Sequence, residues 1–224
     1  MSGIEQSGRV GCKNWPADET APAAHVIAIA LSAGGLSPLR RMMMELPGDL
    51  PAAVVIVQHI HAISHLPEIL NSRGKLRAKF AESAEQLQPN TVYVGPPGRH
   101  LVIGPDGRFE LANAPRLRCV RPSADWMFES VAASFGDRTV AVVLSGRLAD
   151  GSRGVMRVKE AGGRVIVQEP ATCMFADMPL AAIRTGAVDD VLPPEQLAMG
   201  SVRALFARDL ELDARQWHDP FNAA

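Results

Sequence analysis

Short apolar runs alternate with amphipathic segments along most of the chain. The runs are rich in β-branched side chains and bounded by turn residues, which predicts strands buried on both faces. They are HVIAIAL (25–31), AAVVIVQ (52–58), TVAVVL (139–144) and RVIVQ (164–168). Strands of this kind separated by helices predict an α/β fold, with a doubly wound, mostly parallel sheet and helices on both faces.

Helix signals fill the spaces between these strands. A helix start is marked by proline in the first turn or by a hydroxyl or acidic side chain, and a helix end by glycine or proline. The expected helices are LRRMMMEL (39–46), HLPEILNS (65–72), a helix from the N-cap Ser123 through Phe135 with Asp125 in its first turn, GVMRVKEAG (154–162), and helices opened by Pro179 and Pro194 that run through Ile183 and Phe206.

The pattern changes between Lys79 and Leu111. Four short strand-like segments occur there, KFAES, TVYVG, HLVIG and RFELA, and Asp106-Gly107 is a hairpin signal. We expect a small antiparallel β insertion in this region.

The ends of the chain differ from its centre. Residues 1–24 are polar and contain proline, which predicts a disordered N-terminal tail, and residues 209–224 predict a loosely held C-terminal tail. The folded domain is expected over 25–208. We find no targeting segment, and the apolar runs are shorter than the ~20 residues a membrane helix needs, so we expect no membrane insertion and a cytoplasmic protein.

Composition excludes several classes of protein. Apolar residues make up 47% of the chain, enough for a substantial core, and the formal net charge of −1 argues against a nucleic-acid binder. The cysteines, Cys12, Cys119 and Cys173, are widely spaced and odd in number, which favours a reducing compartment. No HExxH motif or Cys/His cluster occurs, so we expect no metal site.

Three chemistry-bearing residues follow predicted parallel strands. Ser32, His59 and Asp150 each come just after a strand, and ligand sites of such sheets form at the carboxyl ends of the strands. A serine hydroxyl needs an imidazole to take its proton and a carboxylate to orient that imidazole. The spacing therefore permits a serine hydrolase triad.

Each of these residues also has a simpler interpretation. The SAGG turn is compatible with an ordinary glycine turn or a phosphate loop, although it lacks the G-x-G-x-x-G spacing. His61 and His65 are rivals of His59, and Asp150 is a plausible N-cap for the helix that follows it. The spacing alone leaves these alternatives open.

Six segments, taken together and in their order along the chain, are far more specific than any one motif. They are IALSAGGLSPLRRMM, VVIVQHIH, YVGPPGRHL, RPSADWMFESVA, AVVLSGRLADGSRGV and VQEPATCMFADMPLAAI, which extend from about His25 to Leu197. In this order they resemble the catalytic domain of the bacterial chemotaxis protein-glutamate methylesterases. The resemblance covers most of the predicted domain.

The resemblance implies a fold, an activity and a site. It places the nucleophile at Ser32, the base at His59 rather than His61, and the acid at Asp150. The implied reaction is hydrolysis of methyl esters on receptor glutamates, with deamidation of receptor glutamines in some members and no cofactor. The implied partners are the cytoplasmic domains of methyl-accepting chemoreceptors, with a chemotaxis methyltransferase as a further candidate.

The glycine turn after the nucleophile is expected to position substrate and to stabilise an oxyanion. Gly34 and Gly35 permit a sharp turn, and the helix start that follows offers free N–H groups. Ala33 and Arg147 complete the candidate set for oxyanion stabilisation or substrate positioning.

The sequence departs from the resemblance at two places. The turn before the acid usually reads G-M-G or G-T-G but is Gly146-Arg147-Leu148 here, which bears on the local backbone and on the Arg147 N–H. No receiver domain precedes His25, so we expect a stand-alone catalytic domain whose activity does not depend on phosphorylation. The alternative function is a catalytically weak adaptor that binds a receptor or a methyltransferase.

Overall fold

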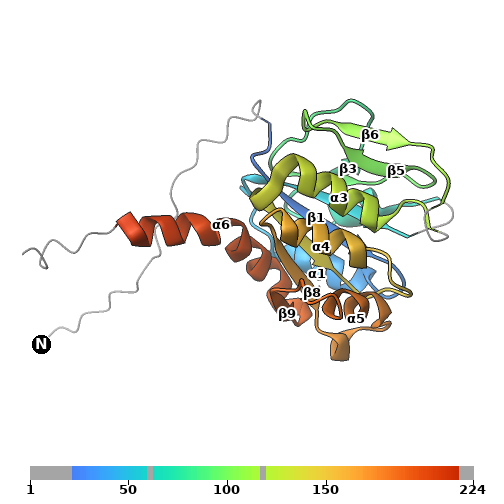
Figure 1. The fold of residues 1–224 in the computed structure, drawn as a ribbon. Coiled ribbons are helices and arrows are strands. Elements are labelled where there is room, and N and C mark those ends of the chain that lie inside the picture. Colours follow the sequence, from blue (N-terminus) through green and yellow to red (C-terminus); the bar gives the residue numbers. More distant parts are fainter. Residues whose placement is uncertain (1–21, 60–62, 117–119, 217–224) are drawn as a thin grey trace, which may run out of the picture.

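A seven-stranded parallel sheet forms the centre of the molecule in a computed structural model that describes residues 22–59, 63–116 and 120–216 (Figure 1). The strand order is β3-β4-β2-β1-β7-β8-β9, and every neighbouring pair runs parallel. The strands are β1 (His25–Leu31), β2 (Ala52–Gln58), β3 (Arg77–Phe80), β4 (Thr91–Val94), β7 (Thr139–Val143), β8 (Arg164–Gln168) and β9 (Asp190–Leu192). The predicted doubly wound α/β fold is confirmed.

The sheet is covered on both faces because its central strands are apolar throughout. In β1, Val26, Ala28 and Ala30 pack on one face, and Ile27, Ile29 and Leu31 pack on the other. The first face carries α3 (Ala124–Phe135), α4 (Ser152–Glu160), α5 (Asp177–Ile183) and a β hairpin; the second carries α1 (Leu36–Glu45), α2 (Leu66–Asn71) and α6 (Leu197–Gln216). Short 3-10 turns lie at Gly136–Arg138, Pro170–Thr172 and Pro194–Gln196.

The predicted antiparallel insertion is smaller than expected. Among the described strands, β5 (His100–Ile103) and β6 (Phe109–Ala112) form the one antiparallel pair, extended by an isolated antiparallel bridge between Gln86 and Arg108. Strands β3 and β4 belong to one edge of the parallel sheet. Parallel neighbours are usually joined through a helix. Because the connection over 81–90 contains no helix, the sequence pattern there resembles a hairpin.

Two further features differ from the sequence prediction. Strand β9 was not predicted because it has three residues and lies half exposed at the sheet edge. Helix α6 does not end at Phe206 but continues to Gln216, across the expected boundary at 208, and its last part projects away from the sheet (Figure 1). None of the described helices is long and apolar enough to cross a membrane.

Helices α3 and α4 approach closely at Gly154. A Cβ atom at this position would lie 2.6 Å from Phe128 Cβ and 2.9 Å from the Asp125 carbonyl oxygen. Backbone and Cβ atoms have little freedom to move, so this helix pair requires a residue without a side chain.

We predict that Gly154→Val lowers the free energy of unfolding by at least 1–3 kcal/mol, the usual range for overpacking. Gly48→Ala is the matched control, because its new Cβ would meet a single neighbour at 3.6 Å. Urea denaturation compares the two variants. Equal stability of Gly154→Val and the native chain would contradict the close packing of α3 on α4.

Candidate active site

The carboxyl ends of three adjacent strands bring the predicted triad residues together. Strand β1 lies between β2 and β7, and Leu31 at its end is in register with Gln58. The His59 N–H donates to the Leu31 carbonyl oxygen at 3.1 Å, and the Ser32 N–H donates to the Ser145 carbonyl oxygen at 3.1 Å. As a result Ser32, His59 and Asp150 line one cleft of about 690 Å³.

His59 and Asp150, which both line this cleft, form a hydrogen-bonded pair. His59 Nε2 lies 2.7 Å from Asp150 Oδ2, and both side chains are largely buried. An ionised carboxylate can only accept, so Nε2 carries the hydrogen and Nδ1 is left as the basic nitrogen. Among the described residues no hydrogen bond joins the Ser32 hydroxyl to the His59 ring, and such contacts are often long before substrate binds.

Asp150 also caps the N-terminus of α3. Its carboxylate accepts hydrogen bonds from the Ala124 N–H at 2.6 Å, the Asp125 N–H at 3.3 Å and the Ser123 hydroxyl at 2.9 Å. The predicted N-cap position of Ser123 is confirmed, but its hydroxyl donates to Asp150 instead of capping the helix. The alternative interpretation of Asp150 as the N-cap of α4 is wrong, because Gly151 occupies that position.

Asp125 performs the corresponding role for the other helix. Its Oδ1 accepts from the Arg153 N–H at 3.0 Å and the Gly154 N–H at 2.9 Å, both in the first turn of α4. Asp125, in α3, therefore satisfies free N–H groups at the start of α4, and Asp150, just before α4, satisfies those at the start of α3. This exchange fixes the position of Asp150 relative to α3.

These hydrogen bonds determine the ionisation of Asp150. Burial alone would raise its pKa, but the hydrogen bonds from His59, the Ala124 N–H and Ser123 outweigh burial, so the pKa of Asp150 is lowered. The carboxylate is therefore ionised throughout the neutral range, as an acid that orients an imidazolium must be.

The buried side chain of Ser145 holds the turn that carries Ser32. Ser145 Oγ donates to the Ala33 carbonyl oxygen at 2.9 Å and accepts from the Phe175 N–H at 3.1 Å. The Ser145 N–H in turn donates to Gln168 Oε1 at 2.9 Å. Sequence reasoning gave Ser145 and Gln168 no role, although both stand in segments that carry the family resemblance, AVVLSGRLADGSRGV and VQEPATCMFADMPLAAI.

Glycine is required where this turn meets the loop after β7. A Cβ atom on Gly34 would lie 2.7 Å from Ser145 Oγ, and one on Gly146 would lie 2.8 Å from Ser32 Cβ and collide with Met178. Gly34 also has a φ of +79°, a left-handed conformation that glycine adopts without strain. The two glycines let the loops after β1 and β7 pack against one another.

Four residues were expected to position substrate or an oxyanion, and the structure places three of them along the cleft. Ala33, Gly34 and Arg147 line the cleft. Gly35 is buried and does not line the cleft, and its N–H donates to the Ser32 carbonyl oxygen at 3.1 Å. Gln58, Leu36, Val120 and Arg121 also line the cleft, and none of them was among the candidate site residues.

The turn that departs from the family pattern keeps a glycine-like backbone. Leu148, at the position of the missing second glycine, has a φ of +67°. Its side chain is 66% exposed, so the strain is not offset by burial. The neighbouring guanidinium of Arg147 lies 4.3 Å above the Phe175 ring.

Of the other candidates, those that the structure describes lie away from the triad. His65 is exposed at the N-terminus of α2 and does not line the cleft, and His61 lies outside the described residues. Cys173 is a free thiol whose pKa is raised to about 11 by burial, which makes it a poor nucleophile. Within the described ranges no group of His, Cys, Asp and Glu side chains could hold a metal ion.

The Ser123 hydrogen bond generates a prediction about acid stability. Ser123→Ala removes a donor to the ionised carboxylate, so we expect a loss of about 1–2 kcal/mol of unfolding free energy at neutral pH. A lowered pKa means that this contribution is present above ~pH 4 and is lost as Asp150 becomes protonated at lower pH. The difference between Ser123→Ala and the native chain should therefore shrink in acid.

Ser134→Ala on the same helix is the control for this measurement. Its hydroxyl donates to the carbonyl oxygens of Ile103 and Gly104, which do not titrate. The stability cost of this variant should not change with pH. A pH-independent cost for Ser123→Ala as well, measured by urea denaturation, would contradict the assigned bond to an ionised Asp150.

The strained turn generates a second prediction. Leu148→Gly should raise the free energy of unfolding by about 0.5–1 kcal/mol, because relief of the left-handed conformation exceeds the entropic cost of glycine. Leu148→Ala keeps the strain and should show no gain. Thermal denaturation separates the two variants, and equal melting temperatures would show that the turn relaxes without glycine.

Comparisons with known proteins place this geometry in a family. The model of the CheB methylesterase family matches residues 27–200. A protein-glutamate methylesterase/protein-glutamine glutaminase of Anaeromyxobacter dehalogenans is 40% identical over 79% of this chain and 53% of its own length. A putative enzyme of the same description from Leptospira interrogans is 37% identical over 77% of this chain and 90% of its own length.

The fold agrees with this match. The crystal structure of the Thermotoga maritima CheB methylesterase catalytic domain superposes with a TM-score of 0.77 at 32% identity, covering 80% of this chain and 97% of that one. The chain spans about half the length of the first curated relatives it matches. Sequence, fold and the arrangement of the cleft together show that the chain belongs to the CheB methylesterase family.

Proposed function

We propose that this protein is a serine hydrolase that removes methyl esters from glutamate side chains of chemoreceptors. Glutamine side chains in the same position are a second substrate, because ester hydrolysis and amide hydrolysis proceed through the same acyl-enzyme. The names of the relatives, protein-glutamate methylesterase and protein-glutamine glutaminase, support both reactions.

One observation carries the proposal. The 2.7 Å bond between His59 Nε2 and Asp150 lies in the same cleft as Ser32. The bond orients the ring and leaves Nδ1 as the nitrogen that takes the Ser32 proton, as a triad requires.

The reaction follows from these roles. Ser32 Oγ attacks the ester carbonyl carbon while His59 Nδ1 takes the hydroxyl proton. The carbonyl oxygen becomes an oxyanion that the backbone N–H of Arg147 and those of Ala33 and Gly34 stabilise. The intermediate expels methanol, which takes its proton from His59, and leaves an acyl-Ser32. Water, deprotonated by His59, then releases the glutamate carboxylate and restores the serine.

Partners follow from the substrate class. We propose that the chain meets the cytoplasmic domains of methyl-accepting chemoreceptors, and that it works in the cytoplasm. A chemotaxis methyltransferase, which would make the ester that this enzyme removes, is a further candidate partner.

A catalytically weak adaptor is the second candidate, and the Leu148 turn favours it. Strain beside Arg147 would shift an N–H that must meet an oxyanion within about 3 Å. Covalent labelling of Ser32 by a fluorophosphonate distinguishes the two functions, because only an activated serine reacts. An unlabelled native chain would favour the adaptor.

Removal of triad members tests the enzyme directly. Ser32→Ala and His59→Ala should each lower kcat for methanol release from methylated receptor by at least about a thousandfold, and the double variant by little more, because triad residues act as a unit. Ser37→Ala, an exposed serine in α1, is the control and should keep native turnover. Near-native turnover in His59→Ala would refute its assignment as the base.

A further inference from the structure

The cleft carries more positive charge than ester hydrolysis needs. Arg121 and Arg147 both line it, and Asp150 is the single carboxylate in the described lining. Asp150 is already committed to His59 and to the N-terminus of α3. Within residues 22–59, 63–116 and 120–216, neither arginine forms an ion pair with a carboxylate.

Arg121 is held in place on one side of its guanidinium. Nη1 donates to Asn113 Oδ1 at 3.2 Å and to the Ala114 carbonyl oxygen at 2.9 Å. The same segment is fixed by the fully buried His100, whose Nε2 donates to the Pro115 carbonyl oxygen at 3.1 Å. Nε of Arg121 is buried and has no partner in the described chain. The cation is therefore positioned by its surroundings before any ligand is present.

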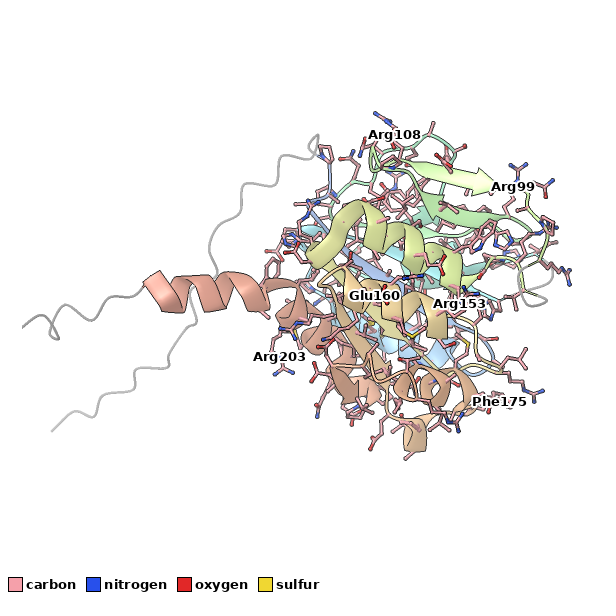
Figure 2. All side chains as sticks on the ribbon, in the orientation of Figure 1. Arg99, Arg108, Arg153, Glu160, Phe175 and Arg203 are labelled. Atoms are coloured by element: carbon pink, nitrogen blue, oxygen red, sulfur yellow. The ribbon has the colours of Figure 1, made fainter. Side chains whose placement is uncertain are left out.

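Arg147 approaches the cleft from the loop after β7. The flat face of its guanidinium stacks on the Phe175 ring, and the N–H donors point outward in the plane of the guanidinium. Figure 2 shows Phe175 on the side of the molecule that also carries Arg153 and Arg99, and shows Arg203 and α6 on the opposite side. Arg147 is exposed, so a ligand can reach it.

A glutamate methyl ester is neutral, and the proposed mechanism stabilises its oxyanion with backbone N–H groups. The proposed chemistry therefore makes no use of the charges of Arg121 and Arg147, two residues that line the cleft. A planar guanidinium fork binds a carboxylate through two parallel hydrogen bonds.

We infer that Arg121 and Arg147 bind carboxylate side chains that flank the methyl ester, so that this enzyme selects esters within acidic segments of its substrate protein. This inference names the substrate class of the site and rests on the proposed function.

Binding to a chain that cannot turn over tests the inference separately from catalysis. In Ser32→Ala, the affinities of two synthetic peptides are compared by fluorescence anisotropy. Each peptide carries one glutamate methyl ester, flanked by glutamates in one and by glutamines in the other. We expect the acidic peptide to bind about tenfold more tightly at low ionic strength, and this preference to decrease as salt is added.

Arginine variants in the same background locate the preference. Arg121→Gln and Arg147→Gln should each reduce it about threefold, and Arg147→Glu should abolish it. Arg203→Gln, which removes an exposed charge on the far side, is the matched control and should leave the preference unchanged. If Arg121→Gln fails to fold, Arg147→Glu decides the question alone, because its side chain is exposed.

Equal binding of the two peptides by Ser32→Ala, or a preference that survives in Arg147→Glu, would overturn the inference. Either result leaves the esterase proposal intact if the native chain releases methanol from the glutamine-flanked peptide. Conversely, tight and arginine-dependent binding of the acidic peptide supports the inference even if the native chain releases no methanol. The absence of methanol release would refute only the esterase proposal.

Discussion

The hydrogen bonds of the Asp150 carboxylate connect the catalytic geometry to the fold. Two N–H groups at the start of α3, the Ser123 hydroxyl and the His59 ring all donate to it. Their combined effect outweighs the cost of burying a charge and keeps the group ionised. The base of the cleft is therefore organised by interactions that also begin a helix, and the position of His59 depends on how α3 is seated on the sheet.

Strand order explains why the three residues meet. The chain leaves β1 toward β2 and β4 and later returns to the other side of β1 as β7. The helices that follow β1 and β7, α1 and α4, therefore cover opposite faces of the sheet, and the cleft lies at this switch point. Apolar runs were enough to predict β1, β2, β7 and β8, and with them the edge at which Ser32, His59 and Asp150 would lie. That information is local, because each strand is buried on both faces and its composition shows it.

Other features depend on contacts that no local pattern encodes. Strands β3 and β4 join the parallel sheet through a crossover without a helix, and β9 is recognisable only through its pairing with β8. The reversed roles of Ser123 and Asp150 have the same origin, since a hydroxyl before a helix and an aspartate before a helix both look like caps of the helix that follows. Which carboxylate caps which helix is decided by the packing of α3 against α4.

The double duty of Asp150 affects how such a domain could lose its activity over time. Ser32 and His59 have no comparable part in starting a helix, so drift could replace either one while the protein still folds. Asp150 would be retained for folding alone, because its loss would leave N–H groups at the start of α3 unsatisfied. A descendant that keeps the aspartate but not the serine or the histidine would therefore fold without being an esterase. The aspartate by itself is no evidence of catalysis.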